Sequence, residues 1–315
     1  MEFGALANPA LMDRPEFQAR MILPPDPIHT RERLGWLKAN QKPADQKVLT
    51  GCPVWNNPSW PGSLYPAGTT TKNALGHYAK KFQTVELNST FYGIPELETV
   101  LRWKTEAGSP FLFCPKIPKI ISHDRMLKEC LEITRVFQER MGHLEKSLGP
   151  AWLQLPPGFS PDRLPALKNW IENAWDRNQA LAVEFRHPGW FLDSMLIPEA
   201  TEILEKNKVA TVITDTPGRR EVLHLTLTAN WVFIRFTGNE RHAYDRKRLD
   251  DWAKKLEGWL ESGIRRILFF VHEPSEEKIP ETVNDFIHRI NPVISKYGSS
   301  LTPWSHWQPE QPTLF

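Results

Sequence analysis

Cysteine is scarce in this chain, and no cysteine motif is present. The 315 residues include only Cys52, Cys114 and Cys130, with no Cys-x-x-Cys pair. This pattern supports neither a disulfide framework nor a zinc knuckle, and it is typical of a reducing compartment. No apolar stretch approaches the ~20 residues that cross a bilayer, and the first residues lack the regions of a signal peptide. We therefore expect a cytoplasmic protein without a membrane segment.

Strong net charge and the common nucleotide-binding motifs are also missing. The net charge is +2, which neither indicates nor excludes nucleic-acid binding by itself. No Walker or Rossmann glycine pattern occurs, and no serine stands in a Gly-x-Ser-x-Gly context. These absences disfavour phosphate-loop enzymes, dinucleotide-binding domains and triad hydrolases.

What the sequence does contain is a repeated alternation of apolar runs and helical patterns. Eight short runs are mainly apolar without a strict alternation, as in strands that are buried on both faces; they cover residues 48–55, 82–88, 111–117, 150–155, 180–186, 209–214, 231–236 and 266–271. Helical patterns follow seven of them, at residues 73–80, 96–106, 125–144, 163–178, 194–206, 245–262 and 281–290. Residues 217–230 show no helical pattern. Eight such units over roughly 245 residues predict an α/β fold with one TIM-like (β/α)₈ barrel.

The predicted barrel covers residues 47–292 and has a segment on either side. Residues 1–46 are an N-terminal extension that is broken by prolines, with a short helix predicted at residues 30–39. Its scattered basic residues fit a solvated arm or, alternatively, an arm that contacts phosphates. Residues 293–315 form a short C-terminal tail that contains prolines.

Polar residues gather at the carboxyl ends of the predicted strands, where barrels of this kind place their functional groups. We predict Glu86 and Glu184 as acid–base carboxylates. Lys116 and Arg235 suit a phosphate or carboxylate group. The predicted binding residues are Asn88, Tyr92, Lys116, Gln154, Arg186, His187, Asp215 and Arg235. A buried structural ion pair of Glu184 and Arg186 with Arg235 or Lys116 is the alternative.

Two other kinds of site use the same residues. Glu86 and Glu184 could form a glycosidase pair, although the sequence does not define their separation. Oxygen and nitrogen ligands for a metal-dependent hydrolase are also present, namely Glu184, His187, Asp215 and His272. No His-x-His or His-Glu-x-x-His spacing supports a metal, so the cofactor stays undefined.

Four segments together are similar to the YecE-like family, also called domain of unknown function 72. They are residues 60–66 (WPGSLYP), 84–92 (TVELNSTFY), 154–157 (QLPP) and 183–190 (VEFRHPGW), within a resemblance that spans about residues 49–291. The resemblance implies a TIM-like barrel and no assigned activity. The sequence departs from the family pattern at three places. The first strand usually begins with a Gly-Thr-Ser-like segment, which here contains Cys52. Thr237 stands in place of His after the seventh strand, and His272-Glu273 in place of paired Asn after the eighth. All three lie at the predicted mouth and indicate a divergent subgroup or a changed activity.

The tail ends in Gln311-Pro312-Thr313-Leu314-Phe315. This segment resembles the Gln-x-x-Leu-Phe peptide by which bacterial DNA-processing proteins dock to the sliding clamp, and Gln311, Leu314 and Phe315 would be the docking residues. The leading hypothesis is a barrel whose mouth binds a phosphate-bearing ligand, with nucleic acid among the candidates. Whether the protein is an enzyme is left open. The alternative is a non-enzymatic DNA-maintenance adaptor that docks to the clamp through its tail.

Overall fold

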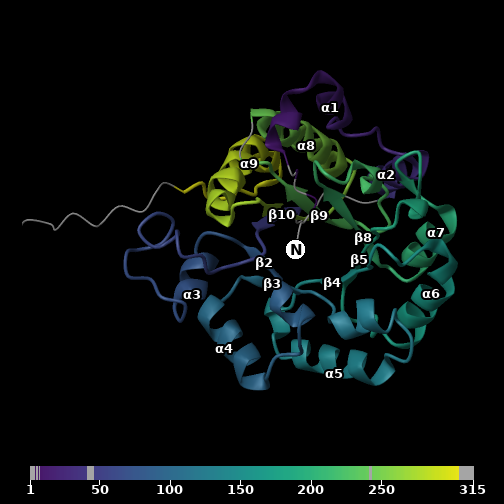
Figure 1. Cartoon of the computed structure of the whole chain (residues 1–315), viewed down its shortest axis with the longest axis horizontal. Coiled ribbons are helices and arrows are strands. Elements are labelled where there is room, and N and C mark those ends of the chain that lie inside the picture. Colours follow the sequence, from purple (N-terminus) through teal and green to yellow (C-terminus); the bar gives the residue numbers. More distant parts are fainter. Residues whose placement is uncertain (1–3, 5, 7, 41–45, 241–242, 305–315) are drawn as a thin grey trace, which may run out of the picture.

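The fold is a ring of parallel strands surrounded by helices (Figure 1). This computed structural model describes residues 4, 6, 8–40, 46–240 and 243–304. The ring consists of β1 (Lys47–Gly51), β2 (Thr84–Leu87), β3 (Leu112–Pro115), β4 (Ala151–Gln154), β5 (Leu181–Glu184), β8 (Ala210–Asp215), β9 (Trp231–Thr237) and β10 (Arg266–His272). Each predicted strand is present, which confirms the TIM-like barrel.

Backbone hydrogen bonds close the ring. Six strands pair in parallel in the order β1-β10-β9-β8-β5-β4, and β2 pairs with β3. The two sheets are joined on one side where Glu86 N–H donates to Cys52 C=O (3.2 Å), and on the other where Ile117 N–H donates to Trp152 C=O (2.9 Å). A Cβ at Gly51 would lie 2.1 Å from the Thr84 carbonyl oxygen, so β1 can approach β2 this closely because position 51 is glycine.

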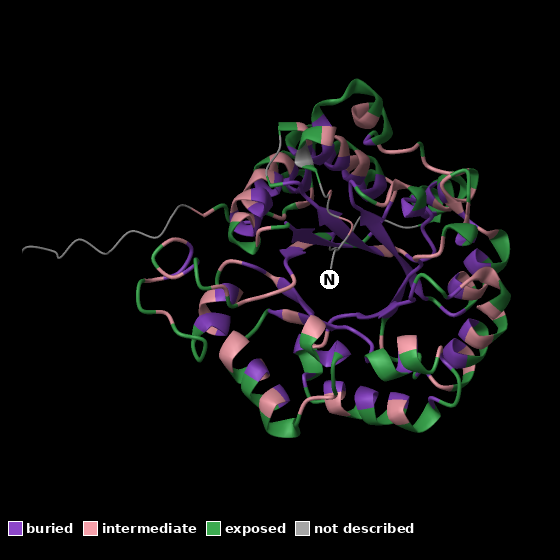
Figure 2. Cartoon of the chain, in the orientation of Figure 1, coloured by how far each residue is buried: buried purple, intermediate pink, exposed green. Residues whose placement is uncertain are grey.

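The outer layer contains α3 (Ala74–Ala79), α4 (Leu97–Ala107), α5 (Leu131–Gly142), α6 (Leu164–Asn173), α7 (Pro198–Lys206), α8 (Ala243–Glu261) and α9 (Ile279–Ile294). The strands are almost wholly buried and the helices expose their outer faces (Figure 2). This burial on both faces explains why the strands read as continuous apolar runs.

Two predicted helix starts were wrong. The helix predicted from Arg125 begins at Leu131, because Met126, Leu127 and Glu129 have positive φ angles (48°, 66° and 51°), which a right-handed helix does not allow. The helix predicted from Ser194 begins at Pro198, where proline suits the first helical turn. An antiparallel hairpin of β6 (Phe191–Leu192) and β7 (Met195–Leu196) precedes it.

The N-terminal extension packs against the barrel wall, so its description as a solvated arm was wrong. It contains α1 (Pro15–Arg20) and α2 (Ile28–Asn40), and the side chains of Met12, Met21 and Leu37 are buried. In Figure 1, α2 lies between α7 and α8. The chain between β8 and β9, residues 216–230, contains only a 3-10 turn at Arg220–Val222 and no α-helix.

Helix α2 occupies the position that the missing helix after β8 would take. Thr30 Oγ1 donates to Leu225 C=O (2.8 Å) and accepts from Leu227 N–H (3.0 Å). Arg33 donates to Glu205 of α7 (2.6 Å). Just before α2, Asp26 accepts from side chains of α8, Lys255 Nζ (3.1 Å) and Trp259 Nε1 (3.2 Å). The extension thereby supplies a missing part of the helical layer.

Candidate functional site

A guanidinium group lies at the centre of the polar cluster at the carboxyl ends of the strands. Arg235 of β9 is fully buried and makes a two-point ion pair with Glu86 of β2: Nε to Oε1 is 2.7 Å and Nη2 to Oε2 is 3.1 Å. Arg235 Nη1 donates to Glu184 Oε2 of β5 (3.0 Å). One side chain therefore connects the three strands β2, β5 and β9 across the barrel interior.

Glu184 extends the cluster toward the neighbouring strands. Its Oε1 accepts from Arg186 Nε (2.9 Å) and from Thr214 Oγ1 of β8 (3.0 Å), and its Oε2 also accepts from Gln154 Nε2 of β4 (2.8 Å). The other end of the same amide, Gln154 Oε1, accepts from Lys116 Nζ (2.9 Å). An unbroken path of hydrogen bonds thus runs from Arg235 to Lys116, which follows β3.

Both carboxylates are held in their charged form. Burial by itself would raise the pKa of Glu86, but Arg235 and His272 outweigh it and hold that pKa well below its ordinary value. Burial opposes ionisation of Glu184 as well, and Arg186 and Arg235 lower its pKa to about 2. A carboxylate this acidic, with hydrogen bonds to both oxygens, is a poor proton carrier near neutral pH. The geometry favours Glu86 and Glu184 as anchors for cations over acid–base groups.

Lys116 has an environment unlike that of the two arginines. Its Nζ lies 4.1 Å from the centroid of the Phe91 ring and 4.7 Å from that of Trp152. The Arg235 guanidinium lies over the same Trp152 ring, at 4.4 Å. Burial first, and then the nearby Arg235 and Arg186, lower the pKa of Lys116 to about 7 although Glu184 opposes the shift. Lys116 is therefore the group of this cluster whose charge changes near neutral pH.

Two histidines and an asparagine surround the cluster. His272 Nε2 lies 3.1 Å from Glu86 Oε1, and Asn88 Nδ2 donates weakly to Glu86 Oε2 (3.4 Å). Burial lowers the pKa of His272 although Glu86 opposes the shift. His123 packs edge-on against Phe91, and burial together with Lys116 lowers its pKa to about 4. Burial thus favours the neutral form of both imidazoles.

The structure brings seven of the ten predicted site residues into this one network and places the other three elsewhere. The seven are Glu86, Asn88, Lys116, Gln154, Glu184, Arg186 and Arg235. Tyr92 is 74% exposed and its ring packs edge-on against Phe91. His187 accepts from Gly189 N–H (3.0 Å) and so caps a 3-10 turn.

Asp215 points away from the cluster. Its carboxylate accepts from Arg248 Nη2 (2.7 Å) and Trp252 Nε1 (2.7 Å) of α8, and also binds Arg220. Side chains alternate along a strand, and Thr214 of β8 already points inward to Glu184. Asp215 must then face the helical layer, where it fastens α8 to the barrel.

The metal and glycosidase alternatives have little support from this geometry. Within the described residues, no group of three or more His, Cys, Asp and Glu side chains is arranged to hold a metal ion. Glu86 and Glu184 bind the same guanidinium, and the oxygens of both carboxylates already accept hydrogen bonds. A glycosidase needs one carboxyl group that keeps its proton near neutral pH, which the low pKa of both groups opposes.

Sequence reasoning missed the aromatic walls around Lys116 and the hydroxyl that binds Glu184. Trp152 stands two residues before Gln154 on β4, so strand alternation places both in the barrel interior. The same alternation places the side chain of Thr214 in the barrel interior and that of Asp215 on the side of the helical layer. His272, which the resemblance led us to expect as a departure from the family pattern, contacts Glu86 directly.

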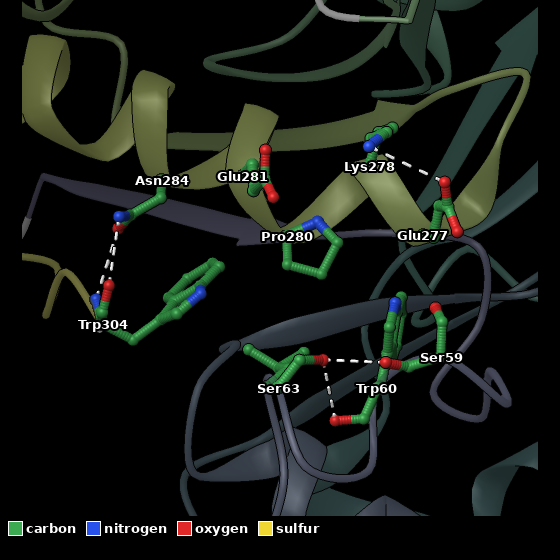
Figure 3. Close-up of a pocket in the computed structure, with 10 residues that line it drawn as sticks. Ser59, Trp60, Ser63, Glu277, Lys278, Pro280, Glu281, Asn284 and Trp304 are labelled. Atoms are coloured by element: carbon green, nitrogen blue, oxygen red, sulfur yellow. Dashed lines mark hydrogen bonds and ion pairs between the residues drawn. The ribbon is translucent and has the colours of Figure 1, made fainter. Parts of the chain in front are cut away.

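Apart from this cluster, a cavity of about 390 Å³ lies at the rim of the barrel (Figure 3). It lies between the loop that follows β1, which supplies Ser59, Trp60 and Ser63, and the start of α9, which supplies Pro280 and Glu281. Trp60 Nε1 is buried and has no hydrogen-bond partner in the described part of the chain. Trp304 also lines the cavity, and its backbone is held by the side chain of Asn284 of α9 (3.1 and 3.2 Å).

These features define a TIM-like barrel protein with a buried ion-pair cluster at the carboxyl ends of its strands. Residues 49–306 match the family model described as protein of unknown function DUF72, and the chain belongs to that family. The UPF0759 protein YecE of Escherichia coli K12 is 30% identical over 270 residues, 80% of this chain and 96% of YecE. The UPF0759 protein YunF of Bacillus subtilis 168 is 24% identical over 228 residues, 62% of this chain and 78% of YunF.

The solved structures agree on the fold. The crystal structure of the DUF72 family protein EF0366 from Enterococcus faecalis V583 superposes with a TM-score of 0.61 at 18% identity. The superposition covers 78% of this chain and 98% of EF0366. The family match begins after α2, so the helix that completes the outer layer lies outside the matched region. No helix within the described ranges is long and apolar enough to cross a membrane.

Proposed function

We propose that the carboxyl end of the barrel binds a small phosphate-bearing ligand, with the Lys116 ammonium as its main contact. The observation that supports this most directly is the charge of the cluster. Among the described residues, three cationic side chains meet two carboxylates, namely Lys116, Arg186 and Arg235 against Glu86 and Glu184. Among the described residues no carboxylate forms an ion pair with Lys116, so when Lys116 is protonated an anion would compensate its charge.

The environment of Lys116 favours a small ligand over a nucleic-acid strand. Only 3% of the residue is exposed, and its Nζ has one hydrogen-bond partner, Gln154 Oε1, in the described part of the chain. A single phosphate group could approach such a position, whereas a strand binds through a continuous basic surface. Arg186, with 16% of its side chain exposed, would provide a second contact at the same edge.

Calorimetric titration with inorganic phosphate, pyrophosphate and a single-stranded oligonucleotide tests the proposal. Lys116→Met should weaken binding of the phosphate compounds about tenfold or more, because a hydrogen bond to a charged group contributes about 1.5–3 kcal/mol. Lys296→Met is the matched control, since Lys296 is exposed and pairs with Glu257 at the far end of α9. Equal affinity in wild type and Lys116→Met, or binding of the oligonucleotide alone, would overturn the proposal.

Docking to a sliding clamp is a second, separate proposal. Gln311, Leu314 and Phe315 lie outside the described residues. The described part ends in a segment that α9 fixes: Asn291 exchanges two hydrogen bonds with the backbone of Leu301 (2.8 and 2.9 Å), and Asn284 does the same with Trp304. The motif follows this anchored segment.

A labelled peptide of residues 305–315 should bind a bacterial clamp saturably, and a Leu314→Ala, Phe315→Ala peptide should not. Equal binding of both peptides would refute docking.

A further inference from the structure

The amine of Lys116 combines burial, flanking aromatic rings and neighbouring cations, which is an arrangement suited to covalent chemistry. We propose that Lys116 condenses with the carbonyl carbon of a small phosphate-bearing aldehyde or ketone and forms a Schiff base. This inference rests on the proposed phosphate site and names the class of substrate that the site would take. In the covalent step Arg186 would hold the phosphate group of the substrate, while Lys116 gives up its proton and its amine reaches the carbonyl carbon. It gives the barrel a reaction type, since amine catalysis through an imine activates the carbon next to the carbonyl group.

The first support is how Lys116 is held. Gln154 presents its Oε1 to Lys116 because Glu184 accepts from its Nε2 (2.8 Å), which fixes the orientation of the amide. An amide oxygen accepts a hydrogen bond from a neutral amine as well as from an ammonium. No carboxylate oxygen of the described residues lies within 4.0 Å of Nζ. Lys116 is therefore positioned by a neutral partner, which leaves its proton easily removed.

The second support is the charge around the amine. A lysine becomes nucleophilic when it is desolvated or placed beside another cationic group, and both conditions hold here. Phe91 and Trp152 flank the amine, and Arg235 lies against the same Trp152 ring. With its pKa lowered to about 7, roughly half of the Lys116 side chains are neutral at pH 7. An ordinary lysine is neutral in about one molecule in three thousand at that pH.

The chemistry balances without an external oxidant or reductant. The neutral amine of Lys116 attacks the carbonyl carbon, a C–N bond forms, and the C=O π electrons move to oxygen, which takes up a proton. Loss of water then breaks the C–O bond and leaves a C=N bond whose nitrogen is protonated. In sum, an ammonium and a carbonyl give an iminium and water. The faces of Phe91 and Trp152 stabilise the iminium as they stabilise the ammonium.

Reductive trapping tests this step on the full-length protein. Glycolaldehyde phosphate with sodium cyanoborohydride should modify Lys116 selectively, as shown by intact mass and peptide mapping. Glycolaldehyde, which lacks the phosphate, should modify Lys116 at least about tenfold more slowly, because binding of the phosphate raises the local concentration of the carbonyl group. Excess inorganic phosphate should protect Lys116 while the labelling of exposed lysines such as Lys296 is unchanged.

Two variants separate the Schiff base from the phosphate site. Lys116→Met should lose both the adduct and phosphate affinity. Lys116→Arg keeps the positive charge but cannot form an imine, so it should lose the adduct and retain phosphate binding within about threefold of wild type. Phosphate binding to wild type without labelling of Lys116 would overturn the Schiff base alone. Absence of both binding and labelling would overturn both proposals, and labelling spread evenly over the exposed lysines would overturn the covalent one.

Discussion

Arg235 and Glu86 face each other across the barrel interior and form a fully buried two-point ion pair, with N–O distances of 2.7 and 3.1 Å. Neither residue is near the other in sequence, and each comes from a different sheet of the ring. Replacing one partner would remove the nearest counter-charge of a buried group. The pair therefore couples the stability of the barrel to the order of the cluster.

Glu86→Gln should destabilise the protein by about 3–5 kcal/mol, because it removes one charge of the buried pair and breaks the two-point contact of Arg235, which keeps its ion pair with Glu184. Urea unfolding followed by circular dichroism measures the loss. Glu145→Gln is the matched control, since Glu145 forms an exposed ion pair with Lys104; it should unfold like wild type. A Glu86→Gln protein as stable as the control would mean that the pair contributes nothing net.

Stability should fall in acid between about pH 4.5 and pH 2, as Glu184 is protonated. The pKa of Glu184 is lowered from 4.5 to about 2 in the folded protein, so its stabilising effect is fully present above pH 4.5 and disappears as the pH falls toward 2. Urea midpoints across this range measure the effect. Glu184→Gln should be less stable than wild type at pH 7 and should show a shallower decline in acid. An identical decline in both proteins would contradict this assignment.

Trapping of Lys116 should depend on pH near neutrality. The neutral amine is the nucleophile, so the rate should rise with pH through about 7 and level off above it. The charged or titratable groups around the amine are Arg235, Arg186, Glu184, Glu86 and His123. Both glutamates stay ionised, and His123, whose pKa is lowered to about 4, stays neutral across this range. The initial labelling rate from pH 5.5 to 9.5 measures the profile; a midpoint near 10 would show an ordinary lysine.

Helix α2 should be necessary for the stability of the barrel. Thr30→Val keeps the shape of the side chain but removes its hydroxyl, which leaves the Leu225 carbonyl and the Leu227 amide without their buried partner. We expect a loss of about 1–3 kcal/mol. Arg31→Val places the same β-branched residue at the next, exposed position of α2 and is the control. If both variants unfold at the same urea concentration, α2 does not contribute through this contact.

The sequence by itself determined the order and type of nearly all elements of the barrel. Strands buried on both faces are mostly apolar along their length, and that signal is local. It also placed Glu86, Glu184 and Arg235 at strand ends, because the carboxyl ends of parallel strands meet on one side of a barrel. The sequence was less accurate for the helices that begin at Leu131 and Pro198, since the positive φ angles and the short hairpin before them leave weak sequence signals.

Only the tertiary structure decided which polar groups meet and what state each keeps. Asp215 is as polar and as close to a strand end as Glu184, yet it binds α8. Side chains alternate along β8, and because Thr214 points into the barrel, Asp215 points outward. Helix α2 fills the place of the helix that the chain lacks after β8. Its Thr30 contacts Leu225, 195 residues further along the chain, and no local pattern encodes such a contact. The pKa of Lys116 likewise depends on burial between Phe91 and Trp152 and on Arg235, which come together only when the ring closes.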